Sequence, residues 1–588
     1  MKALGMKVLM PCGGEGTCGK CAVEIHPDPP APSLFDLKHL TGEEIERGVR
    51  LACQTRVDRA MSVLISPGMR VLGDKILVDG LKRTFDLDPS VIKTYAELPE
   101  PTLEDQASDL FRIKRALNLP DDRCPDFDID LLRELYSLIR NADFKVTAVS
   151  ANGRMIGIEP GNTVSQRYGI AFDIGTTTVV GTVLDLTTGR ELSNASRLNG
   201  QVVHGEDTVS RIKYVMENPG GRDEMAEKIR WVVNEIIAEA ADKAGIEPSE
   251  IYEAVFVGNT TMSHLFLGLD PSGLSQIPFV PVTNSAVNLR AQDAGIDINP
   301  RGNIHVLPNI AGFVGSDTVG VMLACDFLEP GPIQLAVDVG TNGELALRKD
   351  SDMMVCSTAA GPALEGAALS CGMRAANGAI EHVSFTKKDV ECEVIGGIAP
   401  IGLCGSGIID LMAELLDAGI VDQLGRLLSR EELEGRISPL LAERIVTVDD
   451  QPAFLVSEED GSGTGRGVLL TQKDIRQIQL AKGAISAGIT LLLREMSMTL
   501  GELDEILLAG AFGNYIRKRS AQRIGLLPPV PEERIRFVGN AASTGAKMAL
   551  LSREVRKDAD RIRCRAKHIE LAALPDFMSV FMDSMMFP

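Results

Sequence analysis

Three features are scarce or missing in this chain of 588 residues. No uninterrupted apolar run approaches the ~18 residues that a membrane-spanning helix needs. We also expect no signal peptide, because Lys7 interrupts the short apolar run near the N-terminus and no small-residue cleavage site follows. Basic residues are too few to balance the acidic ones, so the net charge is −21, which argues against nucleic acid and anionic membranes as partners. The cytoplasm is therefore the expected location.

Metal-ligand patterns are also scarce. The seven histidines form no cluster, and only one C-x2-C pair exists where a zinc site would usually take two. Seven of the 11 cysteines are scattered without ligand spacing, and we expect them to be reduced, buried small residues. These seven are Cys124, Cys325, Cys356, Cys371, Cys392, Cys404 and Cys564.

The other four cysteines form one pattern. Cys12, Cys18 and Cys21 lie in PCGGEGTCGKC with the spacing C-x5-C-x2-C, and Cys53 follows in RLACQT. Thiolates that enclose a compact inorganic core need tight backbone turns, which the glycines permit. The spacing is close to the plant-type C-x4-C-x2-C…C of [2Fe–2S] proteins and resembles their adrenodoxin-like variant. We predict an iron–sulfur cluster held by these four thiolates; zinc is the alternative, and a disulfide is disfavoured in a cytosolic chain.

Residues 1–68 are predicted to form a ferredoxin-like domain of the β-grasp type. CAVEIHP (21–27) and MSVLISP (61–67) are expected strands, and Thr41 with Glu44 marks the capped start of a helical turn. The family that this domain resembles has a hairpin and most of a helix before its first cysteine, whereas only a short segment precedes Cys12. We therefore expect a domain that is abbreviated at its front, or whose true start lies upstream.

Residues 69–92 are predicted to be a linker, and residues 93–166 a small α+β middle domain. Helices are expected over 103–117 and 128–142, the second with one apolar face. A hairpin is expected over 145–161, because Asn152-Gly153 suits a type I′ turn. No residue here carries chemistry, so we expect a spacer or a docking module.

A repeated motif marks the rest of the chain. The segments YGIAFDIGTTTVVGTVLD and IQLAVDVGTNGELALRKD each place D-x-G-T between two apolar strands, at 173–178 and 338–343. Such a repeat indicates a duplicated fold whose halves face each other. Glycine lets backbone N–H groups approach an anion and threonine adds hydroxyl donors, so both turns are predicted phosphate loops. Their residues are Gly175, Thr176, Thr177, Thr178, Gly340, Thr341, Asn342 and Gly343.

Five motifs between residues 168 and 551 resemble, in their order, the superfamily of acetate and sugar kinases, heat-shock proteins and actin. Besides the two phosphate loops they are a first connecting helix (309–325), an adenosine loop (506–514) and a second connecting helix (539–551). The adenosine loop contributes Gly510, Gly513 and Asn514. The resemblance implies an ATP-binding domain of two related subdomains over 167–588, in an α/β protein of several domains.

The same resemblance implies catalytic roles for three aspartates. Asp173 and Asp338 would organise Mg²⁺ and water, because carboxylates fit among phosphates only with a divalent cation between them. Asp317, on the first connecting helix, would orient or deprotonate the attacking water. Glycine-rich stretches at 359–373 and 401–416 are expected to open helices, and Glu365 is a further candidate near the nucleotide. His264 is interpreted as structural.

An iron–sulfur unit joined to an ATP-binding unit suggests that nucleotide drives an electron transfer that is otherwise unfavourable. The stretches DIGTTTVVGTVLDL, VGNTTMSHLFLGL, LPNIAGFVGSD and AAGPALEGAA resemble the reductive activators of corrinoid proteins. The resemblance implies ATP-dependent transfer of one electron from the [2Fe–2S] cluster to the inactive Co(II) corrinoid of a methyl-transfer protein, which restores Co(I). It also implies a homodimer through the C-terminal domain and a low-potential electron donor of unknown identity.

Three other functions stay open. A small-molecule kinase would phosphorylate a sugar or carboxylate in the same ATP site, with Asp317 as its base. A chaperone-like ATPase would hydrolyse ATP on binding a partner without transferring electrons. The third alternative is an activator of another low-potential acceptor, such as a radical dehydratase.

Overall fold

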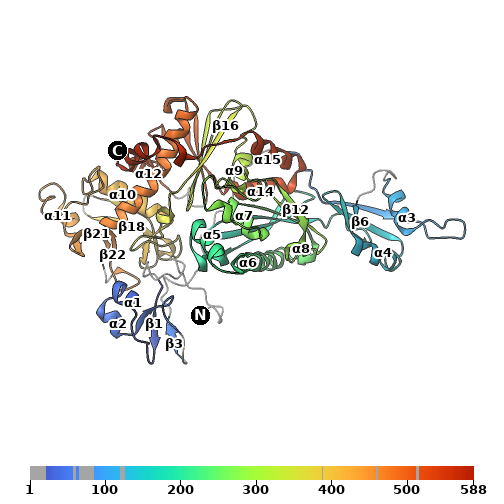
Figure 1. Ribbon diagram of the computed structural model, residues 1–588, viewed down its shortest axis with the longest axis horizontal. Helices are drawn as coiled ribbons and strands as arrows, with labels where there is room; N and C mark the ends of the chain where they lie inside the picture. Colours follow the sequence, from blue (N-terminus) through green and yellow to red (C-terminus); the bar gives the residue numbers. More distant parts are fainter. Residues whose placement is uncertain are drawn as a thin grey trace.

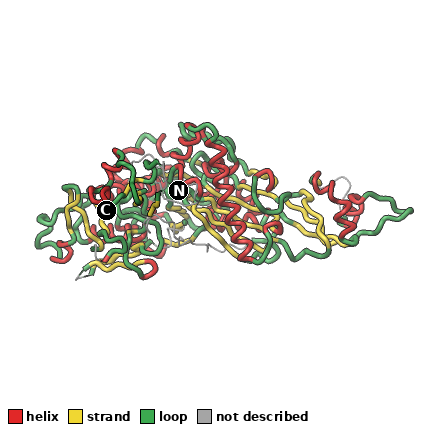
Figure 2. Tube along the Cα trace, turned by 90° about the horizontal axis from the view of Figure 1, so that it is seen from below, coloured by secondary structure: helices red, strands yellow, loops and turns green. Residues whose placement is uncertain are grey.

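The computed structural model describes residues 21–56, 61–64, 85–118, 126–386, 389–458, 461–510 and 516–588. In Figure 1 these residues form a molecule with a large two-lobed centre, a ferredoxin-like unit beside one lobe and a small domain at the opposite end. Figure 2 shows the small domain extending the long axis of the molecule. The predicted domain limits after residues 68, 92 and 166 stay predictions.

The N-terminal unit is a three-stranded sheet in the order β2-β1-β3. β1 (Ala22–His26) pairs antiparallel with both β2 (Val49–Leu51) and β3 (Ser62–Leu64). Two short helices, α1 (Leu34–His39) and α2 (Gly42–Glu46), connect β1 to β2. Thr41 and Glu44 form the predicted capping box, and both predicted strands are confirmed.

The small domain has a four-stranded sheet in the order β4-β6-β7-β5. Its strands are β4 (Ile92–Glu97), β5 (Asp126–Phe127), β6 (Lys145–Ala151) and β7 (Arg154–Pro160), and its helices are α3 (Asp109–Ala116) and α4 (Ile129–Asn141). The predicted hairpin is confirmed, since Asn152 and Gly153 take the positive φ values of +48° and +76° that a type I′ turn requires. Helix α4 is confirmed as well.

The predicted helix over 103–117 is wrong in its first half, because α3 begins only at Asp109. The Thr102 hydroxyl accepts the backbone N–H groups of Glu104 and Asp105, which gives this segment a local turn in place of helical bonds. Ser108 then caps the helix by accepting the N–H of Phe111.

Two six-stranded sheets form the centre of the molecule, and five strands of each follow the same topology. The first has the order β10-β9-β8-β11-β13-β12 and the second β24-β23-β14-β15-β16-β25. In each, an antiparallel meander of three strands is followed by two strands parallel to the first, β11 and β13 or β23 and β24. We call the two halves lobe 1 (168–306) and lobe 2 (334–588). The duplicated fold predicted from the two D-x-G-T motifs is confirmed.

The strands and helices of lobe 1 span the following residues: β8 Tyr168–Ile174, β9 Thr178–Asp185, β10 Glu191–Leu198, α5 Thr208–Glu217, α6 Gly221–Ala244, β11 Ile251–Gly258, α7 Thr260–Leu267, β12 Val287–Arg290, α8 Ala291–Ala294 and β13 Asn303–Val306. The central sheet of lobe 2 comprises β14 Gln334–Val339, β15 Gly343–Lys349, β16 Asp352–Thr358, β23 Glu505–Ala509, β24 Ile535–Gly539 and β25 Lys567–His568.

Lobe 2 also carries two small sheets and several helices. These elements are β17 Ala379–Phe385, β18 Val390–Val394, β19 Gly402–Leu403, α10 Gly405–Asp417, α11 Pro439–Glu443, β20 Ile445–Val448, β21 Gln451–Ser457, β22 Val468–Thr471, α12 Gln472–Glu495, α13 Lys518–Arg523 and α16 Phe577–Met585. The glycine-rich stretch at 401–416 opens α10 as predicted. The one at 359–373 opens no α-helix and forms only a 3₁₀ turn, Pro362–Glu365, which corrects that prediction.

Two helices connect the lobes, α9 (Ser316–Ala324) and α14 (Ala541–Leu551), and α15 (Arg553–Arg565) follows α14 directly. They pack in one hydrophobic core that includes residues of both central sheets. Their backbones are in close contact: a Cβ on Gly545 would lie 2.3 Å from the Cα of Gly320. Glycines at this crossing thus let the second connecting helix pack closely against the first.

Most of the scattered cysteines follow the prediction. Cys325, Cys356 and Cys404 are buried, and Cys371 and Cys392 are partly buried. Cys564 is exposed, because it falls outside the buried stripe of α15, so the prediction is wrong there. Cys124 lies outside the described residues. Across the described ranges, no helix is both long and apolar enough to cross a membrane.

We expect Gly545→Ala to lower the stability of the large domain by about 2 kcal/mol. The new methyl group would press on the Gly320 backbone, and overpacking of a tight core typically costs about 1–3 kcal/mol, more than the ~1 kcal/mol that alanine gains over glycine in helix propensity. Thermal unfolding followed by circular dichroism measures the change. Gly501→Ala is the control, since the nearest atom to its Cβ lies 4.0 Å away. An unchanged midpoint for Gly545→Ala would contradict the close helix contact.

Candidate functional site

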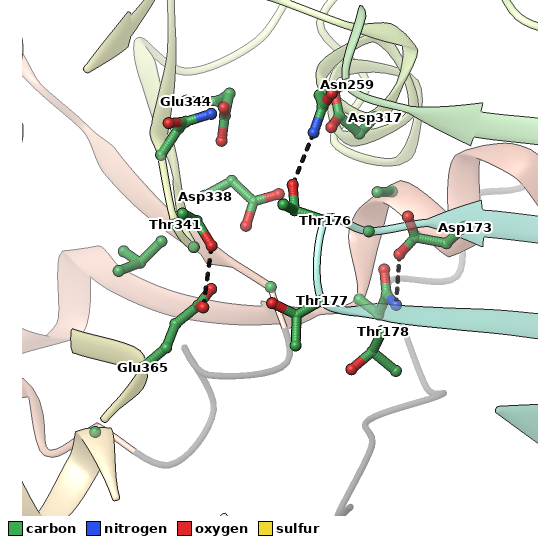
Figure 3. A pocket seen from close by; sticks show the side chains of 18 of the residues that line it. Asp173, Thr176, Thr177, Thr178, Asn259, Asp317, Asp338, Thr341, Glu344 and Glu365 are labelled. Atoms are coloured by element: carbon green, nitrogen blue, oxygen red, sulfur yellow. Dashed lines mark hydrogen bonds between the residues drawn. The ribbon is translucent and has the colours of Figure 1, made fainter. Parts of the chain in front are cut away.

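A cavity of about 280 Å³ lies between the two lobes, where the two D-x-G-T loops face each other (Figure 3). The structure brings most of the predicted nucleotide residues to its wall. These are Asp173, Gly175, Thr176, Thr177, Thr178, Asp317, Asp338, Gly340, Thr341, Asn342, Glu365 and Gly510. Gly343 does not line the cavity, since it packs against Thr358 and Ile485 instead. Gly513 and Asn514 lie outside the described residues.

The first loop joins β8 to β9 and is held from three sides. Within the turn, the Gly175 N–H donates to the Thr178 carbonyl at 3.0 Å, and a Cβ on Gly175 would lie 2.6 Å from that oxygen. Asn199 donates to the Gly175 carbonyl at 2.9 Å, and the buried Arg211 donates to the Thr176 carbonyl. Asn259 donates to the Thr176 hydroxyl at 2.9 Å. These bonds fix the turn before any ligand binds.

The second loop joins β14 to β15 and has its own supports. The Gly340 N–H donates to the Asn342 carbonyl at 3.0 Å, and the Thr341 hydroxyl donates to Glu365 at 3.1 Å. Gly510, at the end of β23, has φ +90°, and a Cβ there would lie 2.6 Å from an Asp338 carboxylate oxygen. Only glycine lets the chain pass this close to Asp338.

Four helices begin at the cavity. Asn259, Cys404 and Asn540 are the N-cap residues of α7, α10 and α14, and Asp317 lies in the first turn of α9; all four residues line the cavity. Helix N-termini present free N–H groups and the positive end of the helix dipole. Their convergence gives the cavity several places for phosphate groups.

Carboxyl groups dominate the electrostatics of the cavity. Burial raises the pKa of Asp173 to about 6, although the Asn540 amide, which donates to it at 3.0 Å, opposes this. Burial, together with neighbouring carboxylates, raises the pKa of Asp317 and of Asp338 to about 7. The same two causes hold the pKa of Glu344 well above its ordinary value. These surroundings favour protonated carboxyl groups, and a bound cation would favour their ionised form.

The cavity lacks enough positive charge of its own to balance these groups. Arg374 is the one cationic side chain among the described residues that line it. In the described part of the chain, no three histidine, cysteine or acidic side chains gather closely enough to hold a metal ion by themselves. A Mg²⁺ ion here would need phosphate oxygens and water as further ligands, which is how Mg²⁺ usually binds with nucleotides. The donor set therefore fits a magnesium–nucleotide complex.

Sequence reasoning missed Asn259, Asn540, Glu344 and Arg374. Two of them share a signal: each asparagine ends a V-G-N triplet, at 257–259 where β11 ends and at 538–540 where β24 ends. Each then caps the following helix and donates to a D-x-G-T residue. Glu344 directly follows the second loop, whereas no local pattern marked Arg374.

The structure describes two of the four predicted cluster ligands, Cys21 and Cys53. The thiol groups of Cys21 and Cys53 lie 3.2 Å apart, too far for a disulfide, whose sulfurs are about 2.05 Å apart. Asp36 holds this region by accepting the Leu51 N–H at 2.7 Å, and the Ala52 N–H donates to the Cys21 carbonyl at 2.7 Å. The structure thus brings two predicted ligands together in a way that fits a shared metal centre. Cys12 and Cys18 lie outside the described residues.

His264 is structural, as predicted. Its Nδ1 donates to the Thr260 carbonyl at 2.8 Å and its Nε2 accepts the Val282 N–H at 2.9 Å. Burial lowers its pKa, so the ring is neutral and both nitrogens are used within the fold.

Models of protein families match nearly the whole chain. Residues 332–588 match the C-terminal domain of RACo, described as the ASKHA domain, and residues 168–329 match the RACo middle region. Residues 80–165 match the RACo linker region. Residues 1–58 match the 2Fe-2S iron-sulfur cluster binding domain.

Individual relatives agree with these matches. The corrinoid activation enzyme RamQ of Eubacterium limosum is 35% identical over 100% of this chain and 95% of its own. The [Co(II) methylated amine-specific corrinoid protein] reductase of Methanosarcina barkeri is 25% identical over 71% of this chain and 76% of its own. A solved structure described as a reductive activator for corrinoid,iron-sulfur protein superimposes with a TM-score of 0.78, at 34% identity over 100% of this chain and 95% of that one.

Cys21→Ser and Cys53→Ser are each expected to remove most of the iron from the protein. A [2Fe–2S] centre needs four ligands, and a hydroxyl replaces a thiolate poorly in this role. Iron and acid-labile sulfide assays on anaerobically prepared full-length protein measure the loss from about two of each per chain. Cys564→Ser, at an exposed cysteine of α15, is the matched control. Full iron content in both variants would rule out these ligands.

Asp338→Asn is expected to stabilise the nucleotide-free protein at pH 8 by about 1–2 kcal/mol, with little effect near pH 4. Because burial and carboxylate neighbours raise the pKa of Asp338 from 3.8 to about 7, the native state holds its proton more tightly than the unfolded state. That contribution to stability is present below pH 4 and is lost as the pH rises through about 7. The amide carries no charge and avoids the loss.

Unfolding midpoints of both proteins across pH 5–8 test this expectation. The exposed Glu443→Gln serves as the control substitution. If the unfolding midpoints of wild type and Asp338→Asn change with pH in parallel, the surroundings of Asp338 do not raise the pKa of its carboxyl group.

Proposed function

The chain belongs to the RACo family of reductive activators of corrinoid proteins, and we propose that it uses ATP to pass one electron to the Co(II) corrinoid of a methyl-transfer protein, restoring Co(I). Its full-length similarity to a corrinoid activation enzyme and to a reductive activator supports this function. One observation carries it: a single chain holds both an iron–sulfur binding domain and a cavity between two D-x-G-T loops at which several helices begin.

In this proposal the cavity binds ATP with Mg²⁺. The helix N-termini and the backbone N–H groups of the two loops receive the phosphates. Asp173 and Asp338 would hold the magnesium ion, which would supply the positive charge that the phosphates and carboxyl groups share. Asp317 would orient the attacking water and accept its proton, which requires the ionised carboxylate that a bound cation favours.

The [2Fe–2S] cluster, when bound, supplies a single electron at low potential. Cys21 and Cys53 would hold it together with Cys12 and Cys18. The domain that carries these ligands contacts lobe 2 through an ion pair between Glu44 and Arg466, on the loop that leads into β22. This ion pair is a point of contact between the electron-carrying domain and the nucleotide-binding domain.

The proposal also includes where the protein acts, how its chains assemble and what reduces its cluster. We propose that the protein acts in the cytoplasm of an anaerobe, as a homodimer formed through its C-terminal domain. An unidentified low-potential donor would reduce its cluster. Nucleic acid and membrane surfaces have no part in the proposal, consistent with the net charge of −21.

ATP dependence is the expected signature of this function. A Co(II) corrinoid protein mixed with the reduced activator should develop Co(I) absorption with ATP, and far more slowly with ADP or without nucleotide. Asp317→Asn should slow the ATP-dependent reaction by about 10²-fold or more, because the attacking water loses its proton acceptor. Equal rates of Co(I) formation with and without ATP would contradict the coupling.

A kinase would behave differently in the same experiment. ADP release that depends on a sugar or a carboxylate, without a partner protein, would favour that alternative. The electron-transfer proposal predicts no such dependence.

A further inference from the structure

A short segment before β4 touches both lobes at a point away from the nucleotide cavity. Its residues Asp88 and Ser90, with Glu253 of lobe 1 and Arg553 and Arg556 of α15, form what we call the coupling junction. None of these five residues lines the cavity. The small domain begins directly after this segment, so the coupling junction lies at its base.

Asp88 binds the point where α14 ends and α15 begins. Its N–H donates to the Leu551 carbonyl at 2.9 Å, and its carbonyl accepts the Arg553 N–H at 2.8 Å, so the segment pairs with residue 552 as a β-bridge. The Arg553 guanidinium also binds the Asp88 carboxylate through two hydrogen bonds, of 2.6 and 3.0 Å. Paired bonds of this kind fix orientation as well as distance.

Glu253 adds a second, fully buried connection. Arg556 donates to both of its carboxylate oxygens, at 2.9 and 2.6 Å, while Ser90 and Asn303 donate to them at 2.6 and 2.7 Å. A buried carboxylate is tolerated only when such partners are all present. Displacements of α15 or of the segment at Ser90 relative to lobe 1 would each break hydrogen bonds to this buried carboxylate and are therefore unfavourable.

Helix α14 connects this junction to the cavity. Its N-cap residue Asn540 donates to Asp173 at 3.0 Å, and its last residue, Leu551, is bonded to Asp88. The helix is buried along its length and crosses α9 with the backbones of Gly320 and Gly545 in contact. A close-packed helix transmits displacement with little internal deformation.

The small domain is fixed to lobe 1 at its base. Lys93 of β4 donates to Glu159 of β7 at 2.7 Å and to the Tyr252 hydroxyl of lobe 1 at 3.0 Å. Arg301 of lobe 1 donates to the Ile156 carbonyl at 2.9 Å. Val91, with residues of β6 and β7, also packs in the hydrophobic core that contains α9 and α14. This domain is thus attached to the connecting helices, which a passive spacer would not require.

We propose that the coupling junction transmits the nucleotide state of the cavity to the small domain. Ligand binding at Asp173 repositions the N-terminal end of α14, the helix carries this change to Leu551, and the Asp88–Arg553 pair passes it to the base of β4. Asp88 and Arg553 are positioning residues in this scheme, since they touch neither nucleotide nor cluster. The inference rests on nucleotide binding in the cavity and does not depend on which acceptor receives the electron.

Hydrogen exchange of the full-length protein tests this, with Mg²⁺ and a non-hydrolysable ATP analogue as the probe. In the wild type, the analogue should slow exchange in the loop at 175–178 and change exchange in β4 and β6 by about threefold or more. Arg553→Gln and Asp88→Ala, at a half-exposed pair, should keep the response of the loop and lose that of β4 and β6. Arg561→Gln, at an exposed arginine of the same helix, should keep both responses.

Each alternative result has a distinct meaning. If the wild-type loop is protected while β4 and β6 do not respond, the coupling is overturned and the nucleotide site stands. If Arg553→Gln and Asp88→Ala keep the wild-type response, the pair does not carry the signal. If the loop itself is not protected, nucleotide binding in the cavity fails and the coupling fails with it.

Discussion

Three aspartates that face one cavity set the main physical constraint on this protein. Asp173 ends a strand of lobe 1, Asp338 ends the matching strand of lobe 2, and Asp317 begins the helix between them. Burial raises the pKa of each, and neighbouring carboxylates add to the rise at Asp317 and Asp338, so the cavity is under electrostatic strain whenever all three are ionised. The magnesium–nucleotide complex of the proposed function would relieve that strain, and both lobes would contact it.

The rest of the large domain positions these three aspartates around the cavity. The paired sheets place the two D-x-G-T turns opposite each other, and close contact at Gly320 and Gly545 lets the connecting helices reach the cavity together. In the N-terminal unit, the thiol groups of Cys21 and Cys53 lie close together beside the three-stranded sheet. The buried Asp36 binds this sheet by accepting the backbone N–H of Leu51 in β2. Nucleotide chemistry and electron chemistry thus occupy separate domains of one chain, as coupling between them requires.

The sequence predicted the parts of the fold that short-range interactions along the chain determine. The two D-x-G-T turns, the capping box of Thr41 and Glu44 and the hairpin at Asn152-Gly153 are all specified by short-range chemistry, and the structure has each of them. The start of α3 was predicted too early, because a Thr102 turn replaced helical bonds there. The positions of Arg374 and of the coupling junction depend on side chains that only the folded chain brings together. No spacing in the sequence indicates them.

The most direct test of the central claim is calorimetric titration of the protein with ATP at pH 7, with and without Mg²⁺, in two buffers of different ionisation enthalpy. The account predicts tight binding only with Mg²⁺, accompanied by net proton release from carboxyl groups whose pKa values lie near 6–7. It also predicts that this release disappears well above pH 8. Equal affinity in the presence of a magnesium chelator, with no protons released at pH 7, would contradict it.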